Sequence, residues 1–161
     1  VKDMIPQFKG VMRESGERPV VEYYEGREAI IGAVKKNLAG NTDDYTYMIY
    51  PRDLVESFFN KKELDQLRAL RIGKNIKTKS IYSYSKGDYN PNNVGERYRI
   101  ADEEKYPIKA EINVSGDKIN IYTLGDNLNS IFIQSKDAAD TLRTLFEIAF
   151  EGLKEKQNKK E

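Results

Sequence analysis

Polar side chains recur at regular intervals along "EINVSGDKINIYT" (111–123), a stretch typical of two short strands joined by a Ser-Gly-Asp turn. Glu111, Asn113, Asn120 and Tyr122 alternate with apolar residues, so one face of the predicted hairpin is apolar and the other polar. The polar face could meet water, line a ligand cavity, or mark the place of a former active site. If helices cover both faces of the sheet, buried Glu and Asn would each cost a few kcal/mol unless they line a polar cavity or find partners. The hairpin is then a candidate wall of a binding site.

The residue types present limit the chemistry, because the sequence contains no histidine and no cysteine. Ser-His-Asp and Cys-His nucleophiles, an imidazole general base and an ordinary zinc site are therefore excluded. Chemistry by carboxylates, lysines or tyrosines stays open. We expect no catalytic residue, no metal site and no cofactor.

Tyrosine is frequent, with 11 residues against 6 phenylalanines and no tryptophan. Its ring can stack and its hydroxyl can hydrogen-bond, which suits a sugar or another polar organic ligand. Tyr50, Tyr82 and Tyr122 are candidate stacking partners on this ground. The alternative is that they are half-buried strand residues favoured for their β propensity.

Two junctions between a predicted strand and a helix could bind an anion. "YEGRE" (24–28) places Glu25 at a strand end before a helix N-terminus, and "YPRD" (50–53) places Arg52 where it could clamp a carboxylate or phosphate. Ordinary helix starts also explain both patterns. Glu25 and Arg52 join Glu111 and Asn113 as candidate ligand contacts.

The bulk properties describe one domain, with 161 residues of which 39% are hydrophobic. The 27 basic and 26 acidic side chains nearly balance, which disfavours nucleic-acid binding by this chain itself. No apolar run approaches the roughly 18 residues that a membrane span needs, and no signal peptide is apparent. We predict a cytoplasmic location without membrane contact.

Strand and helix patterns alternate in the first half of the chain, which predicts an α/β fold: a mixed β-sheet with helices on both faces. The segment 85–106 lacks periodicity and is predicted as a surface segment that can hold a short strand at 97–101. Ser135 can cap a long final helix, with an apolar stripe at Ala138, Leu142, Leu145, Phe146, Ala149 and Leu153. Strands are otherwise predicted at 20–26, 45–50, 76–84, on both arms of the hairpin and at 129–135, and helices at 1–14, before Gly40, after Pro51 and from Asn60 to Gly73.

The order of three segments resembles the effector domain of TrmB-like transcriptional regulators, which follows a winged helix-turn-helix. They are "RPVVEYYEGREAIIGAV" (18–34), "YPIKAEINVSGDKINIYT" (106–123) and "IFIQSKDAADTLRTLFEIAFEGL" (131–153). The resemblance covers nearly the whole chain from about residue 18 and is weakest at 85–106. It implies a phospholipase-D-like fold, sugar binding as in the best-known members, and a dimer that controls an attached DNA-binding domain.

Active enzymes with that fold would carry a His-x-Lys-x4-Asp motif on such a hairpin. With Asp117 as the aspartate, the other two positions hold Ala110 and Ile112. With Lys109 as the lysine, they hold Pro107 and Val114. The resemblance therefore implies a phospholipase-D-like sheet without the catalytic His-Lys-Asp motif, and no enzymatic activity.

These patterns together predict a connector helix at 1–17, an effector-sensing domain at 18–153 and a polar tail at 154–161. The domain would bind a small polar ligand such as a sugar, form a homodimer, and act on DNA only through a winged-helix domain that this sequence does not contain. Two alternatives stay open: a ligand-free structural or dimerisation module, and a phospholipase-D-like phosphodiesterase. A ligand-free module would have a filled hairpin face, with Glu111 paired to a lysine or arginine.

Overall fold

A computed structural model describes residues 18–41, 45–91 and 95–160. The predicted connector helix at 1–17 lies outside the described residues. Seven strands form one sheet in the order β1-β7-β6-β5-β2-β3-β4. The strands are β1 (Val20–Glu25), β2 (Tyr45–Pro51), β3 (Lys77–Ser83), β4 (Gly95–Arg99), β5 (Glu111–Ser115), β6 (Lys118–Thr123) and β7 (Asn129–Gln134). The helices are α2 (Arg27–Gly40), α3 (Arg52–Phe58), α4 (Lys61–Gly73) and α5 (Lys136–Asn158).

The sheet is mixed, as the sequence predicts. β2, β3 and β4 run parallel to one another, whereas β1, β7, β6, β5 and β2 are joined by antiparallel pairs. The predicted hairpin is β5 and β6, with Gly116 at a positive φ of 57° in its turn. A glycine takes this backbone conformation without the steric cost that a side chain adds.

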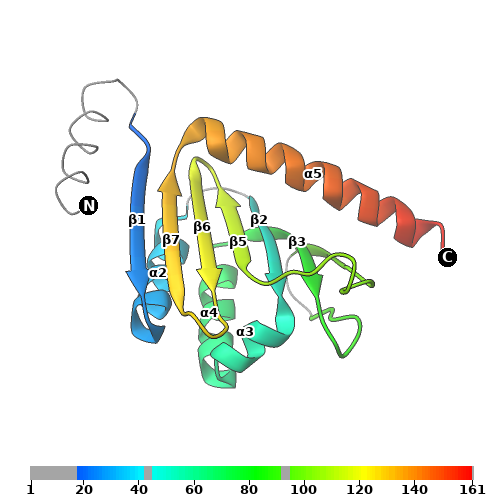
Figure 1. Cartoon of the computed structure of the whole chain (residues 1–161), viewed down its shortest axis with the longest axis horizontal. Coiled ribbons are helices and arrows are strands. Elements are labelled where there is room, and N and C mark those ends of the chain that lie inside the picture. The colour runs from blue at the N-terminus through cyan, green and yellow to red at the C-terminus, as the bar shows by residue number, and fades with distance from the viewer. Residues whose placement is uncertain (1–17, 42–44, 92–94, 161) are drawn as a thin grey trace.

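Helices cover both faces of the sheet, which confirms the predicted architecture (Figure 1). On one face, Ile30 of α2, Val55 of α3 and Leu67 of α4 pack on Met48 and other buried strand residues. On the other face, Ala139 of α5 packs on Val114 of β5 and Ile119 of β6 in a smaller cluster. No helix among the described residues has both the length and the apolar composition needed to cross a bilayer.

Local signals in the sequence set the helix positions on the first of these faces. Asn60 and Glu63 form a capping box at the start of α4, where the sequence predicts that a helix begins. The Glu63 carboxylate also accepts from Arg27 at 2.8 Å, and the same guanidinium donates to the Phe58 carbonyl at 3.2 Å. A single arginine of α2 thus ties α3 and α4 together over the sheet.

The long final helix begins at its predicted cap, but the stripe that faces the sheet differs from the predicted one. Ala139 and Phe150 are buried, and Leu142 and Phe146 contact neighbouring side chains. Leu145 of the predicted stripe is instead 59% exposed. The stripe is misassigned because α5 is apolar on two sides, so periodicity alone does not identify the side that packs on the sheet.

The segment 85–106 contributes more to the fold than its composition predicts. Residues Gly95–Arg99 form the edge strand β4, two residues earlier than the short strand predicted at 97–101. At Gly95 a Cβ atom would lie 2.7 Å from the Thr78 carbonyl oxygen, so only glycine allows β4 to approach β3 this closely. This pairing extends the sheet beneath α4 and brings Arg97 under the helix.

Candidate ligand pocket

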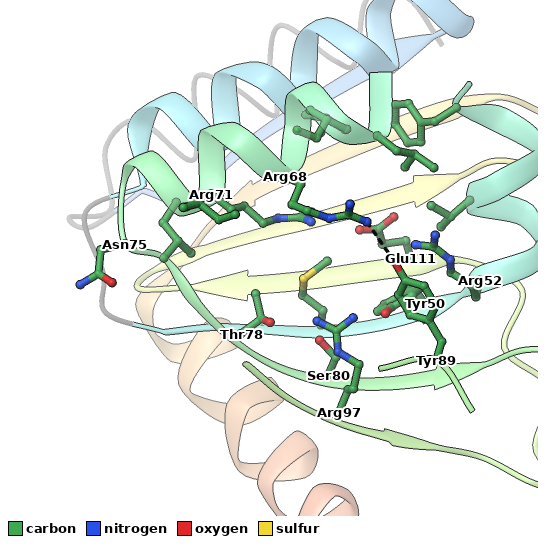
Figure 2. Close-up of a pocket in the computed structure, with 18 residues that line it drawn as sticks. Tyr50, Arg52, Arg68, Arg71, Asn75, Thr78, Ser80, Tyr89, Arg97 and Glu111 are labelled. Carbon is green, nitrogen blue, oxygen red and sulfur yellow. Dashed lines mark hydrogen bonds between the residues drawn. The ribbon is translucent and has the colours of Figure 1, made fainter. Parts of the chain in front are cut away.

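A polar cavity of about 80 Å³ lies between the sheet and helices α3 and α4. Its apolar wall includes Val34, Val55 and Leu67, and its polar lining converges from six segments of the chain (Figure 2). We call this cavity the arginine pocket. Its polar lining residues are Tyr50, Arg52, Arg68, Arg71, Asn75, Thr78, Ser80, Tyr89, Arg97 and Glu111.

The floor of the arginine pocket is one face of the sheet. Thr78 and Ser80 stand two residues apart on β3, and Arg97 pairs with Ser80 from β4. Side chains two residues apart on a strand share a face, so these groups all point toward α4. Tyr50 on β2 and Glu111 on β5 complete this floor.

The roof comes from the two helices. Arg68 and Arg71 are three residues apart on α4 and therefore lie on the same side of that helix. Arg52 is the first residue of α3, directly after β2. Figure 2 shows Arg68 and Arg71 reaching from α4 toward Glu111, with Arg97 approaching from the sheet.

Glu111 is the only carboxylate among the described residues that line the pocket, and it is only 7% exposed. Burial raises the pKa of this carboxyl, although the charge of Arg71, a hydrogen bond from Asn113 and the charge of Arg52 act in the opposite direction. Within the part of the chain that the structure describes, Glu111 has no ion-pair partner at 4.0 Å or closer. The hairpin face is thus not closed by the ion pair that a ligand-free module would have.

Arg71 is in a similar position on the other side of the cavity. Burial lowers the pKa of its guanidinium, while Glu111 acts to raise it. Counting described residues alone, no carboxylate lies within 4.0 Å of this guanidinium. Arg71 is half-buried, and a partly desolvated charge without a close counter-ion lowers the stability of the fold, which is typical of functional sites.

Three arginines surround the ring of Tyr89. The guanidinium carbon of Arg52 lies 4.1 Å from the ring centroid and that of Arg97 lies 5.6 Å from it. Arg68 donates from Nη2 to the Tyr89 hydroxyl at 3.0 Å. The ring attracts these cations, and it holds three like charges from α3, α4 and β4 near one another.

The segment that carries Tyr89 is itself fixed. The Tyr89 backbone N–H donates to the Tyr82 hydroxyl at 2.8 Å, and that hydroxyl donates to the Tyr89 carbonyl at 3.3 Å. Ser85 donates to the Asp53 carboxylate from its hydroxyl at 2.6 Å and from its N–H at 2.9 Å. Hydrogen bonding by Ser85 lowers the pKa of Asp53. The Tyr89 ring is therefore positioned by the sheet and by the start of α3.

The candidate residues predicted from the sequence fall into three groups. Tyr50, Arg52 and Glu111 line the arginine pocket. Asn113 lies two residues from Glu111 on the same face of β5, Tyr82 stacks on Tyr50 with ring centroids 5.9 Å apart, and Tyr122 is opposite Glu111 on β6. Glu25 lies apart from them, exposed at the end of β1, where it accepts from the Tyr23 hydroxyl.

Sequence reasoning missed Arg68, Arg71, Arg97 and Tyr89. The overall balance of charge hides them, because their clustering appears only when α4 is placed over β3 and β4. One signal was available: Arg68 and Arg71 are three residues apart in a helix pattern, and each directly follows a leucine. Arg97 and Tyr89 lie in the segment that has no periodicity.

A line of buried polar groups continues from the pocket across the sheet. Buried atoms without a hydrogen-bond partner in the described part of the chain include Asn113 Oδ1, Asn120 Nδ2, Tyr122 OH and Ser130 Oγ. Burial, and to a lesser degree the charge of Glu111, raises the pKa of Tyr122, so this hydroxyl stays protonated. The polar hairpin face is therefore interior and not exposed to water.

This polar line ends at a second hollow, of about 390 Å³, beneath α2. Small residues of α2 form one wall, and Tyr24 and Phe132 stand on the sheet opposite. Lys36 and Glu22 approach each other at 3.7 Å on its border. The hollow has a more apolar lining than the arginine pocket, and its full set is Glu22, Tyr24, Ala29, Gly32, Ala33, Lys36, Asn37, Gly40, Lys118, Asn120 and Phe132.

The arrangement of strands and helices is similar to that in three solved structures, one of which is a phospholipase D family member. The archaeal chromatin protein TrmBL2, whose structure shows a novel mode of DNA binding, is 12% identical with a TM-score of 0.57, over 93% of this chain and 56% of TrmBL2. NucT from Helicobacter pylori is 6% identical with a TM-score of 0.61, over 83% of this chain and 97% of NucT. Nuc from Salmonella typhimurium, a phospholipase D family member, is 10% identical with a TM-score of 0.55, over 81% of this chain and 93% of Nuc.

These similarities confirm the fold that the resemblance implies. This chain spans little more than half of TrmBL2. No protein-family model matches the sequence, and no curated protein matches it either. At such low identity the fold alone is shared, and function has to be argued from the pocket.

Proposed function

We propose that this chain is the effector-binding domain of a TrmB-like transcriptional regulator and that its ligand binds in the arginine pocket. The observation that supports this proposal best is that a buried carboxylate, Glu111, and a half-buried arginine, Arg71, line one cavity without an ion pair between them among the described residues. Groups of this kind are stabilised when a polar ligand supplies the missing partners. The fold shared with TrmBL2 supports the regulatory context.

The mechanism that we propose is a population shift. A ligand that contacts Arg52, Arg71 and Arg97 would connect α3, α4 and β4, and would favour the arrangement of the domain in which these elements are close. In a dimer this preference changes the relative position of the attached DNA-binding domains, and hence their affinity for DNA. In this proposal the attached domain contacts DNA through a winged helix.

Ligand binding can be tested by thermal unfolding of the whole chain in the presence of sugars, sugar phosphates, nucleotides and amino acids. A ligand at 100 times its Kd adds about 2.7 kcal/mol to the free energy of unfolding, which raises the midpoint by several degrees in a chain of this size. We expect Glu111→Gln to change this shift and Glu25→Gln, at the exposed end of β1, to leave it unchanged. The proposal fails if no compound raises the midpoint, or if Glu111→Gln responds to the active compound as the wild type does.

We also propose that the domain forms a homodimer. Leu145 and Ile148 lie three residues apart on α5, on the side away from the sheet, and are 59% and 67% exposed. Apolar side chains on one side of a helix are often covered by a partner. This observation supports an interface on the outer side of α5.

A phosphodiesterase is the second candidate, because Nuc is a phospholipase D family member and this chain covers 93% of it. The printed sequence has no histidine to form the covalent intermediate that such a motif would use. We expect no release of nitrophenol from bis(4-nitrophenyl) phosphate above the level of buffer. Hydrolysis that the purified chain catalyses, and that disappears in Arg71→Gln, would favour the enzyme.

A further inference from the structure

We propose that the ligand of the arginine pocket carries a phosphate-type oxyanion, which Arg71 and Arg97 bind together with Arg52 and Arg68. This inference rests on the proposed function and specifies the ligand class of the same site. Four guanidinium groups and one carboxylate line a cavity of about 80 Å³. The lining therefore has an excess of positive charge that a neutral sugar would leave uncompensated.

Two of the four arginines, Arg52 and Arg68, also have a carboxylate partner outside the pocket lining. Arg52 pairs with Glu56 at 3.0 Å, but that carboxylate also accepts from the Tyr84 hydroxyl and lies 3.7 Å from Lys86. Arg68 approaches Asp65 at 3.4 Å, at a side chain that is 54% exposed. The exposed Arg68–Asp65 pair contributes little, whereas the Arg52–Glu56 pair, with side chains 12% and 29% exposed, neutralises much of the charge of Arg52. Arg71, which faces the pocket from the last turns of α4, has no such carboxylate among the described residues.

The directions of approach favour a tetrahedral anion. Arg52, Arg68 and Arg97 reach the Tyr89 ring from three different elements, and Arg71 enters from α4 on the side of Glu111 (Figure 2). Donors that converge from several directions match the oxygens of a phosphate or sulfate, whereas a single planar fork would match a carboxylate. Three guanidinium groups held this close repel one another, and a bound anion would offset that repulsion.

The size of the cavity fits one such group. A water molecule needs about 10–15 Å³ of cavity measured in this way, so about 80 Å³ holds a few waters or a single phosphate. Glu111 cannot accept a bond from a phosphate oxygen that carries no proton. It is suited instead to accept from a hydroxyl or amine on the rest of the molecule.

Calorimetric titration of the whole chain tests this inference, with inorganic phosphate, sulfate, glucose 6-phosphate, acetate and glucose as the probes. We expect phosphate and glucose 6-phosphate to bind, and Arg71→Gln and Arg97→Gln each to weaken binding about tenfold or more, as the loss of a charged hydrogen bond does. Arg99→Gln is the matched control. Arg99 lies on the same strand as Arg97 but pairs with Asp88 at 2.7 Å and does not line the cavity. Its substitution is expected to leave the affinity within about twofold, as surface changes away from a site do.

The relative affinities distinguish an organic phosphate from the free phosphate ion as the ligand. Tighter binding of glucose 6-phosphate than of phosphate supports an organic phosphate, and equal binding supports the free ion. Binding of glucose or acetate but not of phosphate overturns the oxyanion inference and leaves a ligand-binding domain. An Arg71→Gln chain that binds phosphate as tightly as the wild type also overturns it. Failure of every probe here, and of every compound in the thermal screen, overturns both proposals.

Discussion

Glu111 is the residue that most clearly lowers the stability of the fold, because its carboxylate is buried on a strand without an ion-pair partner among the described residues. Its raised pKa means that the folded state holds a proton more tightly than the unfolded state does. Stability from this group is complete below the unfolded pKa, near 4.5, and is lost as the pH rises through the higher folded pKa. The sign is opposite to that of Asp53, whose pKa is lowered.

The free energy of unfolding of the wild type should therefore fall as the pH rises above 4.5. Glu111→Gln cannot titrate at this position, so its free energy of unfolding should not show this fall. The decrease is at most about 1.4 kcal/mol per pH unit for one proton. Urea denaturation between pH 4 and 8 measures the difference between the two proteins. Glu28→Gln, at a side chain that is 94% exposed, is the control and should give a curve parallel to the wild type. Parallel curves for Glu111→Gln as well would show that Glu111 titrates normally.

At the scale of elements, the pocket depends on where α4 lies over β3 and β4. Arg68 and Arg71 enter the cavity only if α4 begins directly after its cap, Asn60, and keeps its contact with α2 through Arg27 and Glu63. The capping box and the ion pair share the Glu63 carboxylate, whose pKa is lowered chiefly by the hydrogen bond from Arg27. The start of the helix and its attachment to the domain are thus coupled.

Asn60→Ala is expected to lower the free energy of unfolding by about 1 kcal/mol, because the side chain accepts from the Glu63 N–H at 2.8 Å. Asn60→Ser should retain most of the wild-type stability, since serine also caps helices. Chemical denaturation measures both variants. An alanine variant as stable as the wild type would mean that this cap does not set the start of α4.

Many features of the helices and strands could be predicted from the sequence, and some could not. Caps and turns at Asn60, Ser135 and Gly116 are local signals, and the structure confirms them. The sheet-facing side of α5 is not local, because both sides of that helix are apolar and the choice depends on contacts with β5 and β6. The position of Arg97 depends on β4 pairing with β3, which Gly95 permits through close backbone approach and not through any periodic pattern.

At the scale of the molecule, the fold of this chain is similar both to a DNA-binding chromatin protein and to a phospholipase D family member. Tyr50, Arg52 and Glu111 could be chosen from the sequence because strand ends and buried polar faces are where α/β folds place ligands. The rest of the pocket could not, since its arginines come from elements that are brought together only by the fold. The fold alone does not define the function, so the pocket and the surface have to be tested separately.

The outer side of α5 carries the prediction for assembly. Replacing Leu145 and Ile148 together by glutamate should convert a dimer to a monomer while leaving the unfolding midpoint of the monomer near that of the wild-type fold, because both side chains point away from the sheet. Light scattering coupled to size exclusion measures the mass. Thr141→Glu, at an exposed polar position of the same helix, is the control. A wild-type chain that is monomeric at high concentration would contradict the dimer.

The central claim is that the arginine pocket is the ligand site, and NMR of the arginine side chains tests it most directly. Nε–Hε resonances report on each guanidinium separately during titration with phosphate or glucose 6-phosphate. We expect the resonances of Arg52, Arg68, Arg71 and Arg97 to move together with one dissociation constant, while those of Arg99 and Arg143 stay in place. Shifts confined to residues around the hollow beneath α2, or no shifts at saturating concentrations of either compound, would contradict the claim.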